Sequence, residues 1–333
     1  MTFLPPYSLR RRLFATAAAA GVLAPAWVRA ADPPFPARTV TLISPYAAGG
    51  TNDFLARLIA QRMGEVLKGT IVVDNRAGAN GNVGAGVVAK ALPDGYTLLM
   101  GNSATHGTNP TLYPNQPFSA DKDFAPVGMV GSVPIVAVVH SGLNIGSVAD
   151  LRAYARAHPG KLAFGSSGVG GTGHLCGEAL KAAAGIDMVH VPYKGDAPAV
   201  ADAMGGQVGL AFVGIASAAS QAQGGKIRII AVAHPRRVGS LPDVPTLGEA
   251  GFADMEFAQW YALFARAGTP AAVVERMNQA TRTVLANPEV QKAMAPQGAE
   301  PTYMTPAQLQ AFYQREIVRF REIIQRLNIK VGA

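Results

Sequence analysis

The chain has a single cysteine among its 333 residues, and this scarcity limits how the fold can be stabilised. With only Cys176, no disulfide can form within the chain, so packing must hold a protein of this length together. Cys176 lies in a stretch of small residues typical of a helix. We interpret it as a buried apolar side chain rather than a reactive thiol.

Three further absences exclude classes of function. The six histidines include no pair spaced by four residues, so their spacing gives no support for a metal site. The charged residues form no basic stripe interleaved with aromatic side chains, which argues against nucleic-acid binding. After residue 30, no stretch is long and apolar enough to span a bilayer.

The first 30 residues are typical of an export signal. Arg10-Arg11-Arg12 precedes an apolar, alanine-rich run over residues 13–28, and small residues then predict cleavage near Ala30 or Ala31. Residues 11–14 resemble a twin-arginine signal, with a general secretory signal as one alternative and an uncleaved anchor as another. We therefore expect a mature protein in the periplasm.

Removing this leader changes the charge balance. Four of the 29 basic residues and none of the 21 acidic residues lie in it, which leaves 25 basic against 21 acidic residues. The roughly 300 residues that remain are enough for two domains with sizeable cores.

The mature chain alternates between short β-branched runs and amphipathic stretches. The predicted strands cover residues 39–43, 71–73, 96–100, 135–139, 162–164, 188–191, 208–213 and 227–232, and the last two predicted helices cover 272–285 and 306–327. Such alternation predicts an α/β protein with parallel sheets covered on both faces. In these sheets ligands bind outside the carboxyl ends of the strands.

Two glycine-rich loops follow predicted strands, at residues 45–53 and 165–174. Gly49 and Gly50 let the backbone turn tightly and approach another molecule, and Thr51 or Asn52 can cap the next helix. The free N–H groups at such a helix start favour an anion. From residues 45–53 alone, an ordinary turn is the simpler interpretation. The two loops together are interpreted as halves of a site for a small carboxylate.

Residues 168–173 also match the G-x-G-x-x-G pattern of dinucleotide sites. The acidic residue that should end the next strand is misplaced, because Asp187 precedes that strand and Asp196 follows only after a turn. An exported enzyme with a bound dinucleotide therefore stays as the alternative function. Ser166 and Ser167 do not form a nucleophile elbow, and no triad partner can be assigned.

Short motifs recur in a fixed order along the whole mature chain. They are Pro45…Gly49-Gly50…Asp53, Asn75-Arg76…Gly78-Ala79…Gly81-Asn82, Pro93-Asp94-Gly95-Tyr96-Thr97-Leu98-Leu99, Asn109-Pro110…Leu112-Tyr113, Lys122-Asp123-Phe124, Val191-Pro192-Tyr193-Lys194-Gly195, Gly224-Gly225-Lys226-Ile227-Arg228, Val244-Pro245-Thr246 and Gly268-Thr269-Pro270. This ordered set resembles the Bug-type receptors, which are the extracytoplasmic solute-binding proteins of tripartite tricarboxylate transporters.

The resemblance implies a two-lobed, type II periplasmic-binding-protein fold, with two mostly parallel sheets flanked by helices and a ligand cleft between the lobes. Lobe 1 would comprise residues 31–132 and 240–333, and lobe 2 residues 133–239. It also implies a monomer without catalysis, cofactor or metal. Such a receptor binds a small organic acid through backbone amides and bridging waters, and delivers it to membrane transporter subunits.

The expected ligand contacts lie in the loops that follow the strands. They are Tyr46, Ala47, Ala48, Gly49, Gly50, Thr51, Asp53, Ser103, Thr105, Ser166, Ser167, Gly168, Gly170, Thr172, His174, Tyr193, Gly195 and Asp196. For Asp53, pairing with Arg57 one helical turn later is favoured over a ligand role. His174 stays open between a ligand contact and a structural hydrogen bond. Val213-Gly214-Ile215 departs from the family pattern by being apolar, which suggests a less polar distal end of the ligand.

Overall fold

The computed structural model describes residues 1–3, 35–116 and 118–331, so almost all of the predicted leader and its cleavage site lie outside the described residues. The first half of the remaining chain contains β1 (Val40–Ser44), α1 (Thr51–Leu67), β2 (Ile71–Asn75), η1 (Ala79–Gly81), α2 (Asn82–Ala89), β3 (Thr97–Asn102), η2 (Ala104–Thr108), α3 (Asn109–Leu112), β4 (Phe124–His140), α4 (Val148–Ala157) and β5 (Ala163–Ser166). The second half contains α5 (Thr172–Ala184), β6 (Val189–Pro192), α6 (Asp196–Met204), β7 (Leu210–Gly214), α7 (Ile215–Ala222), β8 (Ile227–Ala233), β9 (Ala258–Arg266), α8 (Ala271–Ala286), α9 (Pro288–Met294), η3 (Ala295–Gln297), β10 (Glu300–Pro301) and α10 (Pro306–Arg326).

The strands form one hydrogen-bonded series in the order β2-β1-β3-β9-β4-β7-β5-β6, and β8 and β10 also pair with β4. The outer groups, β2-β1-β3 and β7-β5-β6, are parallel, as the βαβ alternation predicts. The central pairs are antiparallel, because β9 returns beside β3 and β4 in the opposite direction. The expected α/β fold with helices flanking the sheet is confirmed. The strand pairing is mixed, whereas the sequence predicts mostly parallel sheets.

Strand β4 belongs to both halves of this series. It pairs with β9 through residues 124–134 and with β7 and β8 through residues 135–140. The sequence predicts only its second half, since prolines and glycines interrupt the first. The register against β9 shifts between Pro126 and Gly128 and again between Met129 and Gly131, as expected where bulges accommodate such residues.

Alternate residues of β4 face two different hydrophobic clusters. Val136 and Val138 belong to one cluster, and Ile135, Ala137 and Val139 belong to another. All five side chains are buried, as the period-2 geometry of a strand covered on both faces requires. Cys176 is buried in the second cluster, as the sequence predicts, and burial raises the pKa of its thiol.

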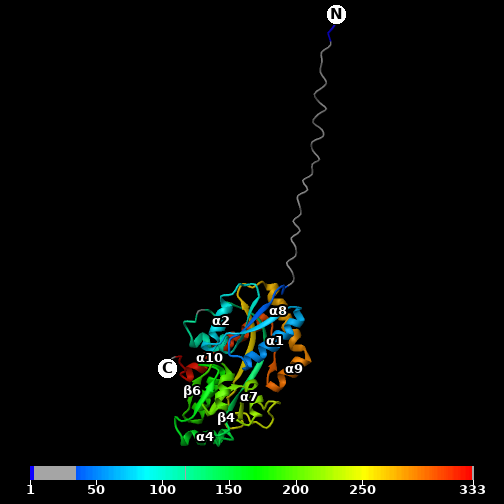
Figure 1. Cartoon of the computed structure of the whole chain (residues 1–333). Helices are drawn as coiled ribbons and strands as arrows, with labels where there is room; N and C mark the ends of the chain where they lie inside the picture. Colours follow the sequence, from blue (N-terminus) through cyan, green and yellow to red (C-terminus); the bar gives the residue numbers. More distant parts are fainter. Residues whose placement is uncertain (4–34, 117, 332–333) are drawn as a thin grey trace. The chain divides into compact units, whose positions relative to one another are not determined.

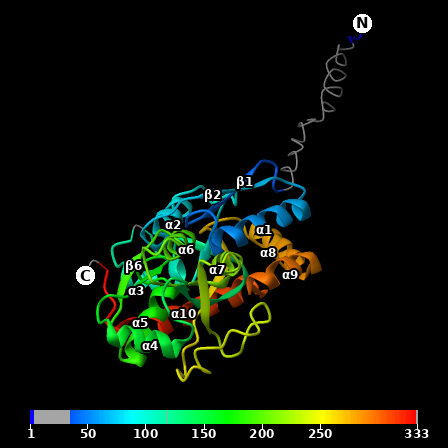
Figure 2. The same ribbon diagram turned by 60° about the horizontal axis from the view of Figure 1, so that its bottom comes forward.

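Helices α8 and α9, near the C-terminus, pack beside α1, the first helix of the fold. The orange helices α8 and α9 lie beside the blue helix α1 in both views (Figures 1 and 2), and the Thr281 hydroxyl on α8 contacts the Met63 sulfur on α1 at 3.8 Å. Helix α1 buries Leu55, Ile59 and Met63, which are spaced as one face of an amphipathic helix. Within residues 35–116 and 118–331, none of the helices is both long enough and apolar enough to cross a bilayer.

Candidate functional site

Glycines precede three helices that begin in or next to the predicted ligand loops. Gly50, Gly171 and Gly195 are the N-cap residues of α1, α5 and α6. A glycine has no side chain that could accept hydrogen bonds from the first turn, so these helix starts keep N–H groups available to another acceptor. By contrast, Ser147 and Thr305 cap α4 and α10 with their hydroxyl groups.

The predicted capping of α1 by Thr51 or Asn52 is wrong, because the helix begins one residue earlier than that role requires. The Thr51 hydroxyl instead donates to the Asp196 carboxylate at 3.0 Å and lies 2.9 Å from the Ser217 hydroxyl. The Asn52 side chain accepts a hydrogen bond from Ser44 at 2.8 Å. Both side chains therefore link α1 to other elements rather than to its own first turn.

A small polar cavity lies at the starts of α1 and α6. Its space of about 10 Å³ is enough for roughly one water molecule. The lining residues are Tyr46, Gly50, Thr51, Asn52, Asn102, Ser167, Asp196, Gln259 and Tyr261. They come from the β1–α1 loop and the start of α1, from the end of β3, from the loop after β5, from the start of α6 and from strand β9.

Asp196 is the only ionisable carboxylate among the described residues that line this cavity, and no lysine, arginine or histidine is among them. Its side chain is buried, with Oδ2 accepting hydrogen bonds from Thr51, from the Gly214 N–H at 3.4 Å and from Ser217 at 3.5 Å. Burial raises the pKa of Asp196 to about 6, against the opposing effect of the Thr51, Gly214 and Ser217 donors and of the nearby Ser167 hydroxyl group.

Two more contacts join the loops around the cavity. Ser103 and Thr172 share a hydrogen bond of 2.8 Å between their buried hydroxyl groups. The Tyr46 hydroxyl lies 3.4 Å from the Asn102 side chain and 3.2 Å from the Asn80 carbonyl oxygen, and burial raises its pKa. The tyrosine therefore enters the cavity as a neutral hydrogen-bonding group.

The structure brings five of the expected ligand contacts to the cavity wall, namely Tyr46, Gly50, Thr51, Ser167 and Asp196. Ala47 and Gly195 lie beside it, where the Ala47 N–H donates to the Lys194 carbonyl at 2.9 Å. Ala48 and Gly49 face outward.

The Asp53 carboxylate has a structural environment. It accepts hydrogen bonds from the Gly49 N–H at 2.9 Å, from Asn75 at 2.9 Å and from Arg57 at 3.0 Å. Burial alone would raise its pKa, but these three donors hold the pKa below its ordinary value. This geometry fits the pairing with Arg57 that the sequence favours.

Four other expected contacts also bond within the protein. His174 Nδ1 accepts from the Gly170 N–H at 2.9 Å, and Ser166 contacts His190 at 2.7 Å. Thr105 accepts from the Asn102 N–H at 3.0 Å. Tyr193 donates to Asp202 at 2.7 Å. These groups shape the loops, and none of the four residues lines the cavity wall.

The glycines of the G-x-G-x-x-G segment are explained by close packing. A Cβ atom at Gly170 would lie 2.1 Å from Leu112, and one at Gly173 would lie 2.0 Å from the Phe212 carbonyl oxygen. A Cβ atom at Gly168 would lie 3.1 Å from the Asn80 side chain. The pattern therefore follows from contacts within the protein, without any role for a dinucleotide.

Sequence reasoning missed Asn102, Gln259, Tyr261 and Ser217. Gln259 and Tyr261 lie two residues apart on β9 and hydrogen-bond to each other through their side chains. A buried glutamine in an otherwise apolar run was the available signal. Ser217 brings a hydroxyl group next to Gly214, so this part of the site is polar although Val213-Gly214-Ile215 is not. The less polar distal end of the ligand that the apolar Val213-Gly214-Ile215 segment suggests stays a prediction.

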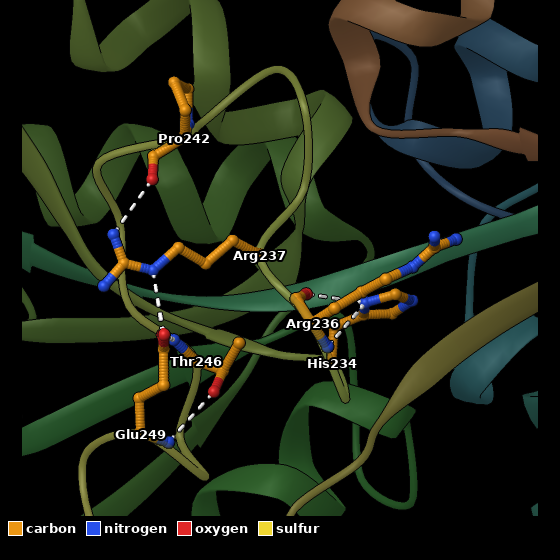
Figure 3. Close-up of polar contacts among 6 residues, drawn as sticks. All are labelled: His234, Arg236, Arg237, Pro242, Thr246 and Glu249. Carbon is orange, nitrogen blue, oxygen red and sulfur yellow. Dashed lines mark hydrogen bonds and ion pairs between the residues drawn. The ribbon is translucent and has the colours of Figure 1, made fainter.

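A larger hollow of about 1200 Å³ lies elsewhere, lined by the end of α7, by residues 236–241, by Lys292 and by residues 295–301. Figure 3 shows that Arg237 beside it donates to the Pro242 carbonyl at 3.0 Å and to Glu249 at 3.0 Å. Arg236 pairs with Glu300 at 3.3 Å. Because these arginines already have partners, we interpret this hollow as a groove between chain segments and keep the polar cavity as the candidate site.

Comparisons with known proteins agree on one family. The family model for the tripartite tricarboxylate transporter family receptor matches residues 55–329. Protein BugT of Bordetella pertussis is 34% identical over 315 residues, which cover 94% of this chain and 95% of BugT.

Two similar solved structures contain carboxylates. An R. palustris protein with adipate is 37% identical with a TM-score of 0.87, over 89% of this chain and 99% of its own. MatC from Rhodopseudomonas palustris, with bound malate, is 32% identical with a TM-score of 0.82, over 87% of this chain and 100% of its own.

Proposed function

The chain belongs to the tripartite tricarboxylate transporter receptor family, and from this premise we propose that it is a periplasmic receptor for a small organic acid. It would deliver that acid to membrane transporter subunits and act as a monomer, without catalysis. Adipate and malate in the two similar structures support a carboxylate of this size as the ligand class.

The observation that carries this proposal is the meeting of two glycine-capped helix starts, those of α1 and α6, at one buried polar cavity. A carboxylate bound there would be neutralised by backbone N–H groups, because the described lining residues include no basic side chain. Helix starts favour anions through these N–H groups and through the helix dipole. Each charge-assisted hydrogen bond contributes about 1.5–3 kcal/mol.

We further propose that two lobes close on the ligand, with lobe 1 formed by residues 31–132 and 240–333 and lobe 2 by residues 133–239. The change in pairing partners of β4 after Pro134 supports the first boundary. The cavity of about 10 Å³ is far smaller than the roughly 300–1,000 Å³ of typical ligand pockets. Ligand entry therefore requires the lobes to separate.

The proposed periplasmic location rests on the leader, with cleavage near Ala30 or Ala31, and on the similarity to a family of receptors. N-terminal sequencing of periplasmic material should begin near Ala31. A protein that still starts at Met1 would contradict the cleavage.

The ligand class is tested by thermal shift and calorimetry with mono-, di- and tricarboxylates, sugars and cations. We expect at least one carboxylate to raise the melting temperature, since a ligand at a hundred times its Kd adds about 2.7 kcal/mol to the free energy of unfolding. The amide of the same acid should not do so. Stabilisation by sugars or cations alone would refute the proposal.

A matched pair of variants tests the role of the backbone. Thr51→Val removes only the hydroxyl group, whereas Thr51→Pro also removes the N–H at the first helical position, where proline fits well. We expect Thr51→Pro to bind the carboxylate at least tenfold more weakly than Thr51→Val, which is about 1.4 kcal/mol. Equal affinities would mean that this N–H group does not hold the anion.

A further inference from the structure

One oxygen of the Asp196 carboxylate has no hydrogen-bond partner. Oδ2 accepts from Thr51, Gly214 and Ser217, whereas Oδ1 is buried without a partner in the described residues. A buried acceptor without a donor is costly, and most buried polar groups in proteins are paired. Since Asp196 also lines the cavity, a ligand bound there could supply the missing donor.

We propose that Asp196 selects a ligand that carries an ammonium group as well as a carboxylate, that is, an amino acid. This inference rests on the proposed receptor function and narrows its ligand class. The ammonium group would donate to Asp196 Oδ1, and the ligand carboxylate would face the N–H groups at the helix starts.

The charges at the cavity favour this class over a simple diacid. Asp196 is the only charged side chain among the described residues of the wall, so a second ligand carboxylate near it would meet a like charge. An ammonium group would instead pair with it in a site shielded from water, where such interactions are strengthened. The four surrounding groups, Thr51, Ser167, Ser217 and the Gly214 N–H, are neutral and cannot replace a cation.

The competing arrangement is a protonated Asp196 that donates to a second ligand carboxylate. The two arrangements differ in their pH dependence, since the pKa of Asp196 is raised to about 6. An ammonium ligand needs the ionised carboxylate, so its affinity should fall as the pH drops below 6. A diacid bound by protonated Asp196 should bind more tightly over the same change.

Few other groups near the cavity can titrate in this range. Tyr46 and Tyr261 face Asp196 from the β1–α1 loop and from β9, and the pKa values of both hydroxyl groups are raised. His174 lies behind the β5–α5 loop, and burial together with Lys181 lowers its pKa to about 4. Among the described groups at the cavity, Asp196 is therefore the one that titrates between pH 5 and 8, and the aminobutyrate probes, which do not change charge in this range, report on it.

The experiment measures affinities of the mature protein by calorimetry for two matched sets of probes. One set is L-aspartate, L-malate and succinate, and the other is 2-aminobutyrate, 4-aminobutyrate and butyrate. In wild type we expect an amino-bearing probe to bind at least tenfold more tightly than the probe of equal length without the amino group. Asp196→Asn, which keeps the shape and removes the charge, should abolish this preference.

Asp202→Asn is the matched control, because it makes the same change on the same helix but outside the cavity wall. It should keep the wild-type preference. The pH series on wild type provides a second measurement that does not depend on the folding of Asp196→Asn.

The possible outcomes separate the two proposals. If carboxylates bind without any preference for the amino group, or if Asp196→Asn keeps that preference, this inference is wrong and the receptor function stands. Tighter binding of the aminobutyrates at pH 5 than at pH 8 would also overturn it, because those probes keep their charge while Asp196 becomes protonated. If no probe and no other carboxylate binds, the receptor proposal itself fails and this inference fails with it.

Discussion

Thr51 donates its hydroxyl hydrogen to Asp196 at 3.0 Å although the two residues are 145 positions apart in the sequence. Thr51 starts α1, which follows a strand of the β2-β1-β3 group, and Asp196 starts α6, which lies between strands of the β7-β5-β6 group. This contact therefore joins the two sides of the candidate site. The hydroxyl group donates to Oδ2 of Asp196, so Oδ1 stays available to a ligand.

We predict that Thr51→Val lowers the free energy of unfolding by about 1–3 kcal/mol, because it removes a donor from a buried carboxylate. The loss should be greater at pH 8 than at pH 5, since the hydroxyl group stabilises the ionised form. Chemical denaturation at both pH values measures this.

Thr283→Val is the control for this prediction. The Thr283 hydroxyl donates to the Gln279 carbonyl at 3.1 Å on the exposed face of α8. Its removal should change stability by less than about 0.5 kcal/mol. Equal effects of the two substitutions would show that the Thr51–Asp196 contact adds nothing specific.

We also predict a pH-dependent stability difference between wild type and Asp196→Asn. The folded-state pKa of about 6 lies above the ordinary value of 3.8, so the favourable contribution of protonated Asp196 is fully present below about pH 4. It is lost as the pH rises through 6. Relative to Asp196→Asn, wild type should therefore lose up to about 3 kcal/mol between pH 4 and pH 7, at about 1.4 kcal/mol for each pKa unit. A difference that stays constant with pH would contradict the raised pKa.

Much of the fold could be predicted because local patterns determine it. The predicted helix over 272–285 is α8 at Ala271–Ala286, and the one over 306–327 is α10 at Pro306–Arg326. Both helices have strong apolar periodicity and a proline at or next to their start. The strand-to-helix loops were equally clear, since glycines and hydroxyl residues interrupt the apolar runs.

Strand β9 was not predicted, for a physical reason. Residues 260–265 form a continuous apolar run that is buried on both faces, so it lacks the alternation that identifies a half-exposed strand. Two cavity residues, Gln259 and Tyr261, were missed with it. The contact between Thr51 and Asp196 was also out of reach, because no local pattern indicates which distant loops meet.

The glycine loop gives a prediction about packing. Gly170 has φ of +80°, and a Cβ atom there would lie 2.1 Å from Leu112. Gly170→Ala should therefore lower the free energy of unfolding by about 1–3 kcal/mol through overpacking, with added backbone strain. In the double variant with Leu112→Ala, the combined loss should be smaller than the sum of the single losses, because the clash is relieved. Additive losses would mean that backbone strain alone is responsible.

The surroundings of Asp53 give the last prediction, which separates the loop contacts from the surface ion pair. The Gly49 N–H, Asn75 and Arg57 are all donors, so Asp53→Asn turns one acceptor into an NH₂ group that must face another donor. We expect it to lower the free energy of unfolding by about 1–3 kcal/mol. The loss should shrink as the pH falls from about 4 through the lowered folded pKa of Asp53, because the stability that this lowered pKa contributes is fully present above the ordinary value and is lost over that range. Arg57→Ala should lower the free energy of unfolding by less than about 1 kcal/mol, since the arginine side chain is 55% exposed and its ion pair is screened by solvent.

Carboxylate affinity should follow the same order, with Asp53→Asn weakening binding more than Arg57→Ala, because the contacts of Asp53 hold the loop that carries Gly49 and Gly50. If Arg57→Ala weakens binding more than Asp53→Asn does, the arginine itself contributes to anion binding and the N–H groups are not its main partners.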